Sequence, residues 1–219
     1  MQNKPEYTRF LPHYHPVGAT FFVTFRLHGS LPQSFLVALS AWYYAELDLI
    51  SKEVPVDRQK KAVHLLQRDY FRKLDHVLDQ CLYGPDFLKE PLAALRLTEQ
   101  LNRFDGTYYR LLAYTILPNH AHVLMDLSVQ LDESGVQPAA YKNLDFIMRR
   151  VKGASARYIN LALGRTGEPC WQEEYNDRYI RDRRHLLAAV DYIKQNPVNA
   201  QVCRHWREHA FTWVHEEFW

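Results

Sequence analysis

Two kinds of periodicity alternate along the chain. Runs rich in aromatic and β-branched residues predict strands at 19–27, 107–117 and 120–127. Pro118 and Asn119 separate the last two runs and are typical of a tight turn, so residues 107–127 are expected to form a hairpin. Pro and Gly are frequent in residues 1–18, which are expected to be irregular.

Apolar residues spaced three and four apart predict helices over about 32–49, 58–82, 91–101, 143–163 and 183–195. Asn196-Pro197 is expected to stop the last helix. Strands and helices that follow one another in this way predict an α+β fold with helices packed on a sheet. No repeat or interdomain linker interrupts residues 1–219, so a single domain is expected. The second helix has the clearest apolar stripe, formed by Val63, Leu66, Tyr70, Leu74, Val77 and Cys81.

Composition excludes several classes of protein. With 47% hydrophobic residues in 219, the chain has enough apolar material for a packed core and is not expected to be disordered. No apolar run reaches the ~18–20 residues that cross a bilayer, so we expect a cytoplasmic protein without a membrane partner. Three widely separated cysteines support neither a disulfide framework nor a cysteine zinc site.

Charge is distributed unevenly. The net charge is +2, but residues 142–207 hold 13 Lys and Arg against 7 Asp and Glu, a local balance of 13 − 7 = +6. Such an asymmetry indicates a polyanionic partner for this basic region. A solvated surface with no partner is the alternative interpretation.

The sequence His120-Ala121-His122 is the sharpest local feature. Side chains alternate along a strand, so both imidazoles share one face while Ala121 points to the other. Two imidazoles on one face can converge on a divalent metal, although two histidines on a half-exposed strand would have the same spacing. A second pair, His13 and His15, lies between prolines, where no sheet is expected to orient the side chains.

In the last predicted helix, Tyr192 and Asn196 are four residues apart and lie together on one face. This face is distinct from the apolar stripe and could present a phenol to a site, but many helical tyrosines are structural. The stripe itself consists of Leu186, Leu187, Val190 and Ile193.

Several ordered motifs resemble one family. Residues 114–125, YTILPNHAHVLM, resemble the metal-binding segment of HUH single-tyrosine transposases, and 170–200 resemble the tyrosine helix region of one branch, the REP-associated tyrosine transposases. Residues 12–16 and 22–26 are similar to the beginning of that family. The resemblance covers about 9–30 and 107–203; Ala121 is smaller than the bulky apolar residue usual there, and about 45–100 resemble a helical elaboration. Within 170–200 the match rests on Trp171, Tyr179-Ile180-Arg181-Asp182, Asp191-Tyr192-Ile193 and Asn196-Pro197-Val198.

The resemblance implies a ferredoxin-like layout and a role for each motif. His120, His122 and Asn196 would bind a divalent metal, Mg²⁺ or Mn²⁺, and Tyr192 would be the nucleophile. Attack by the phenol on a phosphodiester would give a covalent phosphotyrosine and a free 3′-OH, which can later reverse the reaction. The implied activity is that of a metal-dependent tyrosine transposase that cleaves and rejoins single-stranded hairpin DNA of the REP type.

The basic region then has a candidate purpose, because cationic side chains can hold DNA phosphates. The family further implies a monomer and a nucleoid-associated protein. Two alternatives remain open: a DNA-binding protein of the same fold without cleavage, and a metal-dependent nuclease that uses a metal-bound water. The candidate DNA-binding residues are Arg149, Arg150, Lys152, Arg157, Arg178 and Arg181, with Tyr14 and Trp171 as candidate stacking surfaces.

Overall fold

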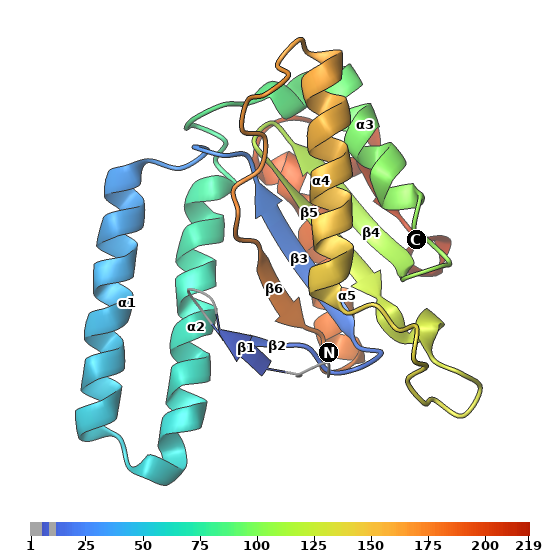
Figure 1. Ribbon diagram of the computed structural model, residues 1–219. Helices are drawn as coiled ribbons and strands as arrows, with labels where there is room; N and C mark the ends of the chain where they lie inside the picture. Colours follow the sequence, from blue (N-terminus) through green and yellow to red (C-terminus); the bar gives the residue numbers. More distant parts are fainter. Residues whose placement is uncertain (1–5, 9–11) are drawn as a thin grey trace.

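The computed structural model describes residues 6–8 and 12–219 (Figure 1). Five antiparallel strands form the main sheet in the order β6-β3-β5-β4-β7. Without β7 this is the strand order of a ferredoxin-like sheet, so the predicted α+β class is confirmed. The strands are β3 (Thr20–Arg26), β4 (Arg110–Leu117), β5 (His120–Asp126), β6 (Asn176–Tyr179) and β7 (Thr212–Val214).

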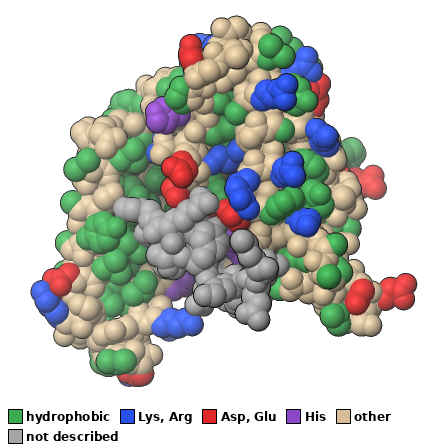
Figure 2. Space-filling model, viewed as in Figure 1, with side chains coloured by type: hydrophobic (Ala, Val, Ile, Leu, Met, Phe, Trp, Pro, Cys, Tyr) green, Lys and Arg blue, Asp and Glu red, His purple; other side chains and the backbone are tan. Residues whose placement is uncertain are grey.

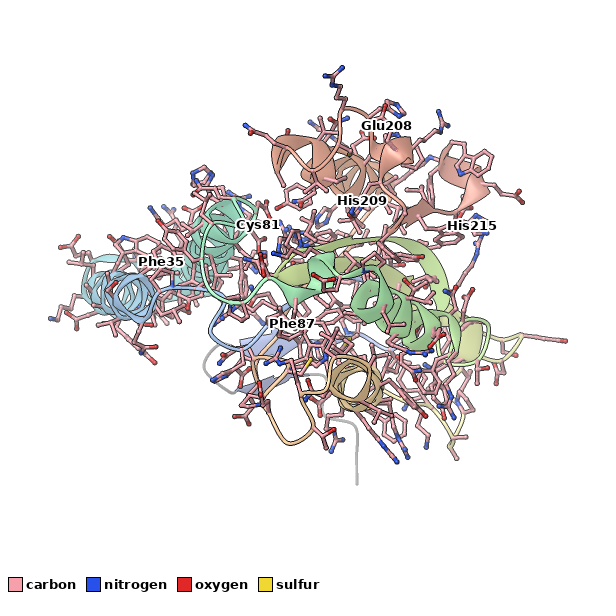
Figure 3. The ribbon with its side chains drawn as sticks, turned by 90° about the horizontal axis from the view of Figure 1, so that it is seen from above. Phe35, Cys81, Phe87, Glu208, His209 and His215 are labelled. Carbon is pink, nitrogen blue, oxygen red and sulfur yellow. The ribbon has the colours of Figure 1, made fainter. Side chains whose placement is uncertain are left out.

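Helices cover both faces of the sheet. On one face, α3 (Pro91–Asn102) and α4 (Leu144–Ala162) pack on the main core, to which β5 contributes Ala121. On the other face, α5 (Arg183–Asn199) packs on Leu124 and neighbouring residues. Seen from above, α4 lies on one side of the sheet and Glu208 and His209, beyond α5, lie on the other (Figure 3). Both faces of the central strand β5 are therefore buried.

Two long helices form a hairpin beside the sheet (Figure 1). They are α1 (Gln33–Glu53) and α2 (Val56–Leu78), which share a separate apolar cluster that includes Leu39, Tyr43 and Tyr70. Both long helices precede α3 in the chain, but α3 packs on the sheet with the main core. The hairpin thus inserts between β3 and the first helix that covers the sheet.

Three predicted boundaries are wrong. Residues 1–18 are not irregular throughout, because β1 (Glu6–Thr8) and β2 (Pro12–Tyr14) pair as a small antiparallel sheet. Helix α2 ends at Leu78, and Cys81 has a left-handed φ of 52° in the turn that follows. Helix α5 continues through Pro197 to Asn199, since a proline in the last turn removes only one hydrogen bond.

The turn after α2 requires glycine at one position. Gly84 has a φ of +70°, and a Cβ there would lie 2.2 Å from the carbonyl oxygen of Gly29. This close approach ties the end of the helical hairpin to the end of β3. In the part of the chain that the structure describes, no helix is long and apolar enough to cross a membrane.

Candidate active site

His120 and His122 lie on the face of β5 that α5 covers, and both side chains are fully buried. Their Nε2 atoms are 3.0 Å apart. The half-exposed strand considered from the sequence is wrong, because β5 is the central strand and is covered on both faces. The structure therefore brings the two imidazoles together in a closed site.

Each imidazole is oriented by a partner at its other nitrogen. His120 Nδ1 lies 2.8 Å from Asn119 Oδ1, and His122 Nδ1 lies 2.8 Å from Thr24 Oγ1. Such contacts fix a ring and leave Nε2 available as a ligand atom. Thr24 lies directly opposite His122 on β3, so the strand register supplies this partner.

Asp79 completes the cluster. Its Oδ1 lies 3.2 Å from the Nε2 atoms of both His120 and His122, and one ligand atom from each residue lies within 4.8 Å of the others. The residue follows α2 immediately, so the inserted hairpin places it there. Asp79 was not predicted as a site residue, because it lies in the apolar pattern of a helix expected to continue to residue 82.

The protonation states suit a metal site. Burial lowers the pKa of His122 to about 4, although the hydrogen bond to Asp79 acts in the opposite direction. Burial alone would raise the pKa of Asp79, but hydrogen bonds and charge from the two histidines hold it well below its usual range. A neutral imidazole beside an ionised carboxylate is the combination that binds divalent cations.

Tyr192 points at the same cluster from α5. Its hydroxyl donates a hydrogen bond to Asp79 Oδ2 at 2.5 Å, and its ring packs edge-on against Phe22 and His122. Burial and the nearby carboxylates of Asp75 and Asp79 raise the pKa of the phenol far above its ordinary value. The side chain is half-buried and held in one orientation.

Asn196 lies one turn further along α5 and is buried. Its Oδ1 is a buried oxygen with no hydrogen-bond partner among the described residues. An orphaned amide oxygen is costly in a protein interior unless a ligand satisfies it. Two imidazole nitrogens, a carboxylate and an amide oxygen form a donor set that fits Mn²⁺ or Mg²⁺.

The candidate basic residues fall into two groups. Arg178 lies near the site, 3.3 Å from Asp75 and over the ring of Phe22, and Arg181 contacts His64 on α2. The others belong to α4, on the opposite face of the sheet, where Figure 2 shows blue side chains gathered. Of these, Arg149, Arg150 and Arg157 are exposed, while Lys152 donates to the carbonyls of Gln172 and Glu173.

The remaining candidates have structural surroundings. His15 is buried and lies 3.0 Å from Asp177, which is not part of the candidate metal site of Asp79, His120 and His122. Trp171 donates a hydrogen bond to Ser155 and packs against Phe25. The side chains of His13 and Tyr14 lie outside the described part of the chain.

The chain shares sequence with a curated protein. A curated protein of Haemophilus influenzae named "Putative REP-associated tyrosine transposase" is 29% identical over 127 residues, which cover 52% of this chain and 70% of that protein. The chain is similar to REP-associated tyrosine transposases. The resemblance seen in the sequence is thereby confirmed. No family model matches the chain.

A solved structure described as a REP-associated tyrosine transposase bound to a REP hairpin is 17% identical, with a TM-score of 0.46. The match covers 94% of this chain and 81% of that one. In the present chain, three of the site residues that the family resemblance suggests, His120, His122 and Tyr192, lie around Asp79. The fourth, Asn196, lies one turn further along α5 than Tyr192.

Proposed function

We propose that this protein is a DNA strand transferase of the REP-associated tyrosine transposase kind. It cleaves single-stranded hairpin DNA and rejoins it through a phosphotyrosine at Tyr192, with a divalent metal at His120, His122 and Asn196. Asp79 joins this ligand set. The similarity to a REP-associated tyrosine transposase supports the substrate class.

One observation carries the proposal. The Tyr192 hydroxyl reaches the carboxylate that both imidazole Nε2 atoms contact, so a nucleophile and a candidate metal site share one residue. A structural tyrosine needs no such neighbours. A phosphate held at the cluster would lie within reach of the phenol oxygen, and this proximity is what attack on phosphorus first requires.

The chemistry follows from the proton on the phenol. Asp79 Oδ2 already accepts a hydrogen bond from Tyr192 Oη and is positioned to take the proton as Oη attacks phosphorus. The new Tyr–phosphate bond replaces the P–O3′ bond, and the departing oxygen leaves as a 3′-OH after taking up a proton. A divalent ion bound at the site would offset charge on the phosphate oxygens. Reversal by a 3′-OH regenerates the phenol and joins DNA without an energy source.

Phosphate contacts are proposed for both basic groups. Arg178 and Arg181 are suited to the strand near the scissile bond, whereas Arg149 and Arg150 on α4 are suited to the hairpin stem. Reversal of either pair to Glu should weaken binding and flatten its dependence on log salt, because each lost phosphate contact lowers the slope by about 0.7–0.9. An unchanged slope and affinity would place the DNA elsewhere.

The decisive experiment is a denaturing gel of the protein with labelled single-stranded hairpin DNA and Mg²⁺ or Mn²⁺. The proposal requires a covalent adduct that the variant Tyr192→Phe does not form. DNA that is cut but never attached would support the nuclease that uses a metal-bound water. DNA that is bound and never cut would support a binding protein of the same fold.

A further inference from the structure

Arg178 lies on the face of the sheet that carries the candidate active site. In the strand register, Phe22 on β3 is opposite Arg178 on β6, and Thr24 on β3 is opposite His122 on β5. Side chains alternate along a strand, so Phe22 and Thr24 share one face. The Arg178 guanidinium carbon lies over the Phe22 ring, 4.8 Å from its centre. The register therefore places a cation one row away from His122.

The Phe22 ring separates this guanidinium from the candidate nucleophile. Tyr192 packs edge-on against Phe22 with ring centres 5.6 Å apart, and His122 stacks on the same ring at 5.3 Å. Burial and two carboxylates raise the pKa of the Tyr192 phenol, whereas the charge of Arg178 lowers it. Electrostatic interactions weaken with distance, so the guanidinium is close enough to act on charge that develops at the phenol oxygen or at a phosphate beside it.

Asp75 holds the guanidinium in this place. The strand that carries Arg178, β6, is the edge strand beside α2, which carries Asp75 (Figure 1). Arg178 Nη2 donates to Asp75 Oδ2 at 3.3 Å, and the two side chains are 34% and 7% exposed. The other N–H groups of Arg178 have no acceptor among the described residues. The guanidinium is thus anchored on one side and free to bind an anion on the other.

Stability alone does not account for this pair. Asp75 Oδ1 is buried and has no hydrogen-bond partner among the described residues. A buried carboxylate with one unsatisfied oxygen adds little to the free energy of unfolding and often lowers it. What the pair does provide is a fixed position for a cation beside the phenol, which is a functional gain.

We propose that Arg178 is a catalytic residue that contacts a non-bridging oxygen of the scissile phosphate, and that Asp75 is a positioning residue that holds it there. The inference rests on the proposed function. As the bond between Tyr192 Oη and phosphorus forms and the P–O3′ bond breaks, the guanidinium offsets the negative charge on that oxygen. It transfers no proton, so the proton still passes from Oη to Asp79, and O3′ still takes up its own.

The test compares a phosphodiester with a methylphosphonate at the scissile position of the same hairpin DNA. In the methylphosphonate a methyl group replaces one oxygen, so the linkage is neutral and needs no guanidinium at that place. Each diastereomer is measured separately. Cleavage is followed in a single turnover with Mn²⁺ and saturating protein, so that differences in affinity do not enter. Arg178→Met keeps the length of the side chain and removes its charge.

The matched control is Arg72→Met on α2. Arg72 also lies 3.3 Å from an aspartate, Asp69, but its side chain is 73% exposed. On the phosphodiester, Arg178→Met should cleave about 100- to 1,000-fold more slowly than wild type, the loss typical of one donor removed from a developing oxyanion. On the diastereomer whose methyl group faces Arg178, the variant should cleave within a few fold of wild type. Arg72→Met should match wild type on every substrate.

Asp75 is tested by a double-mutant cycle with Arg178. Asp75→Ala should slow cleavage of the phosphodiester by about 10- to 100-fold and should add nothing when residue 178 is already Met, because a positioning residue acts through the side chain that it holds. Asp75→Asn keeps an oxygen that accepts from Nη2 and should restore most of the rate. Losses that multiply, or no rescue by Asp75→Asn, would overturn the assignment of Asp75.

The outcomes separate this inference from the proposed function. A wild type that forms no covalent adduct with the phosphodiester hairpin would overturn the proposed function. If the wild type forms the adduct, two results overturn the catalytic role of Arg178 alone: an unchanged rate in Arg178→Met, or an equal loss on the phosphodiester and on both methylphosphonates. Should Arg178→Met fail to fold, as judged by thermal unfolding, Arg178→Gln is measured on the same substrates with the same expectations.

Discussion

The substitution Tyr192→Phe removes one hydroxyl and keeps the ring. That hydroxyl donates to Asp79 Oδ2 at 2.5 Å, and a hydrogen bond to a charged group contributes about 1.5–3 kcal/mol. Part of this is recovered, because the Asp79 side chain keeps both histidine contacts and is 19% exposed to water. A net loss of about 1 kcal/mol in unfolding free energy is expected, or a fall of ~2–4 °C in Tm. The ring contacts with Phe22 and His122 remain.

Thermal unfolding measures this loss, and the denaturing gel measures the adduct. The adduct should disappear completely while hairpin binding stays within a few fold of wild type. Tyr158→Phe, at an exposed position on α4, is the control and should change neither measurement. An adduct that survives in Tyr192→Phe would refute the reasoning, and Tyr175 or Tyr179 would then be tested as the nucleophile.

Four further outcomes are expected. Replacing His120 and His122 together with Ala should abolish the adduct on the gel and leave hairpin binding within a few fold; undiminished cleavage would remove the metal site from the mechanism. Asp79→Asn should lower the Mn²⁺ affinity measured by calorimetry by about 10–100-fold or more, and unchanged affinity would exclude Asp79 as a ligand. Thr24→Val should lower the same affinity by about 10-fold, and unchanged affinity would exclude a role for Thr24 in orienting His122. Burial raises the pKa of Asp75 to about 7, so the contribution of this side chain to stability should fall as pH rises from about 4 to 7 and stay low above. Asp75→Asn should remove that fall in denaturant titrations, with a gain of a few kcal/mol at pH 8 that shrinks toward pH 4; a parallel pH profile would contradict it.

Long periodic patterns could be interpreted from the sequence, and short elements could not. The hairpin of β4 and β5 and all five α-helices were expected, because each has many residues with one period. The strands β1, β2, β6 and β7 have only three or four residues each. Such strands form because a neighbouring edge offers hydrogen bonds, and that edge is not adjacent in the sequence. Leu187 was assigned to the apolar stripe of α5 but is 41% exposed, because the sheet contacts a narrower face of the helix than the sequence pattern suggested.

The candidate site likewise contains residues that could be predicted from the sequence and one that could not. His120 with His122, and Tyr192 with Asn196, are pairs whose spacing on one element could be read from the chain. Asp79 could not be found so, because its position depends on how a 46-residue stretch from Gln33 to Leu78 docks beside the sheet. Because a helix was predicted over 58–82, no turn was expected at Asp79.

Electrostatics explain why the acidic residues do not exclude a DNA substrate. Two carboxylates, Asp75 and Asp79, lie near the phenol, and each would repel a phosphate if it were alone. Asp75 instead pairs with Arg178, and Asp79 contacts both histidines. Both carboxylates come from α2 and the turn after it, whereas the partners come from the sheet. The inserted hairpin therefore supplies negative charge where the sheet supplies hydrogen-bond donors. A bound cation would make the local charge more positive and so favour binding of the phosphate.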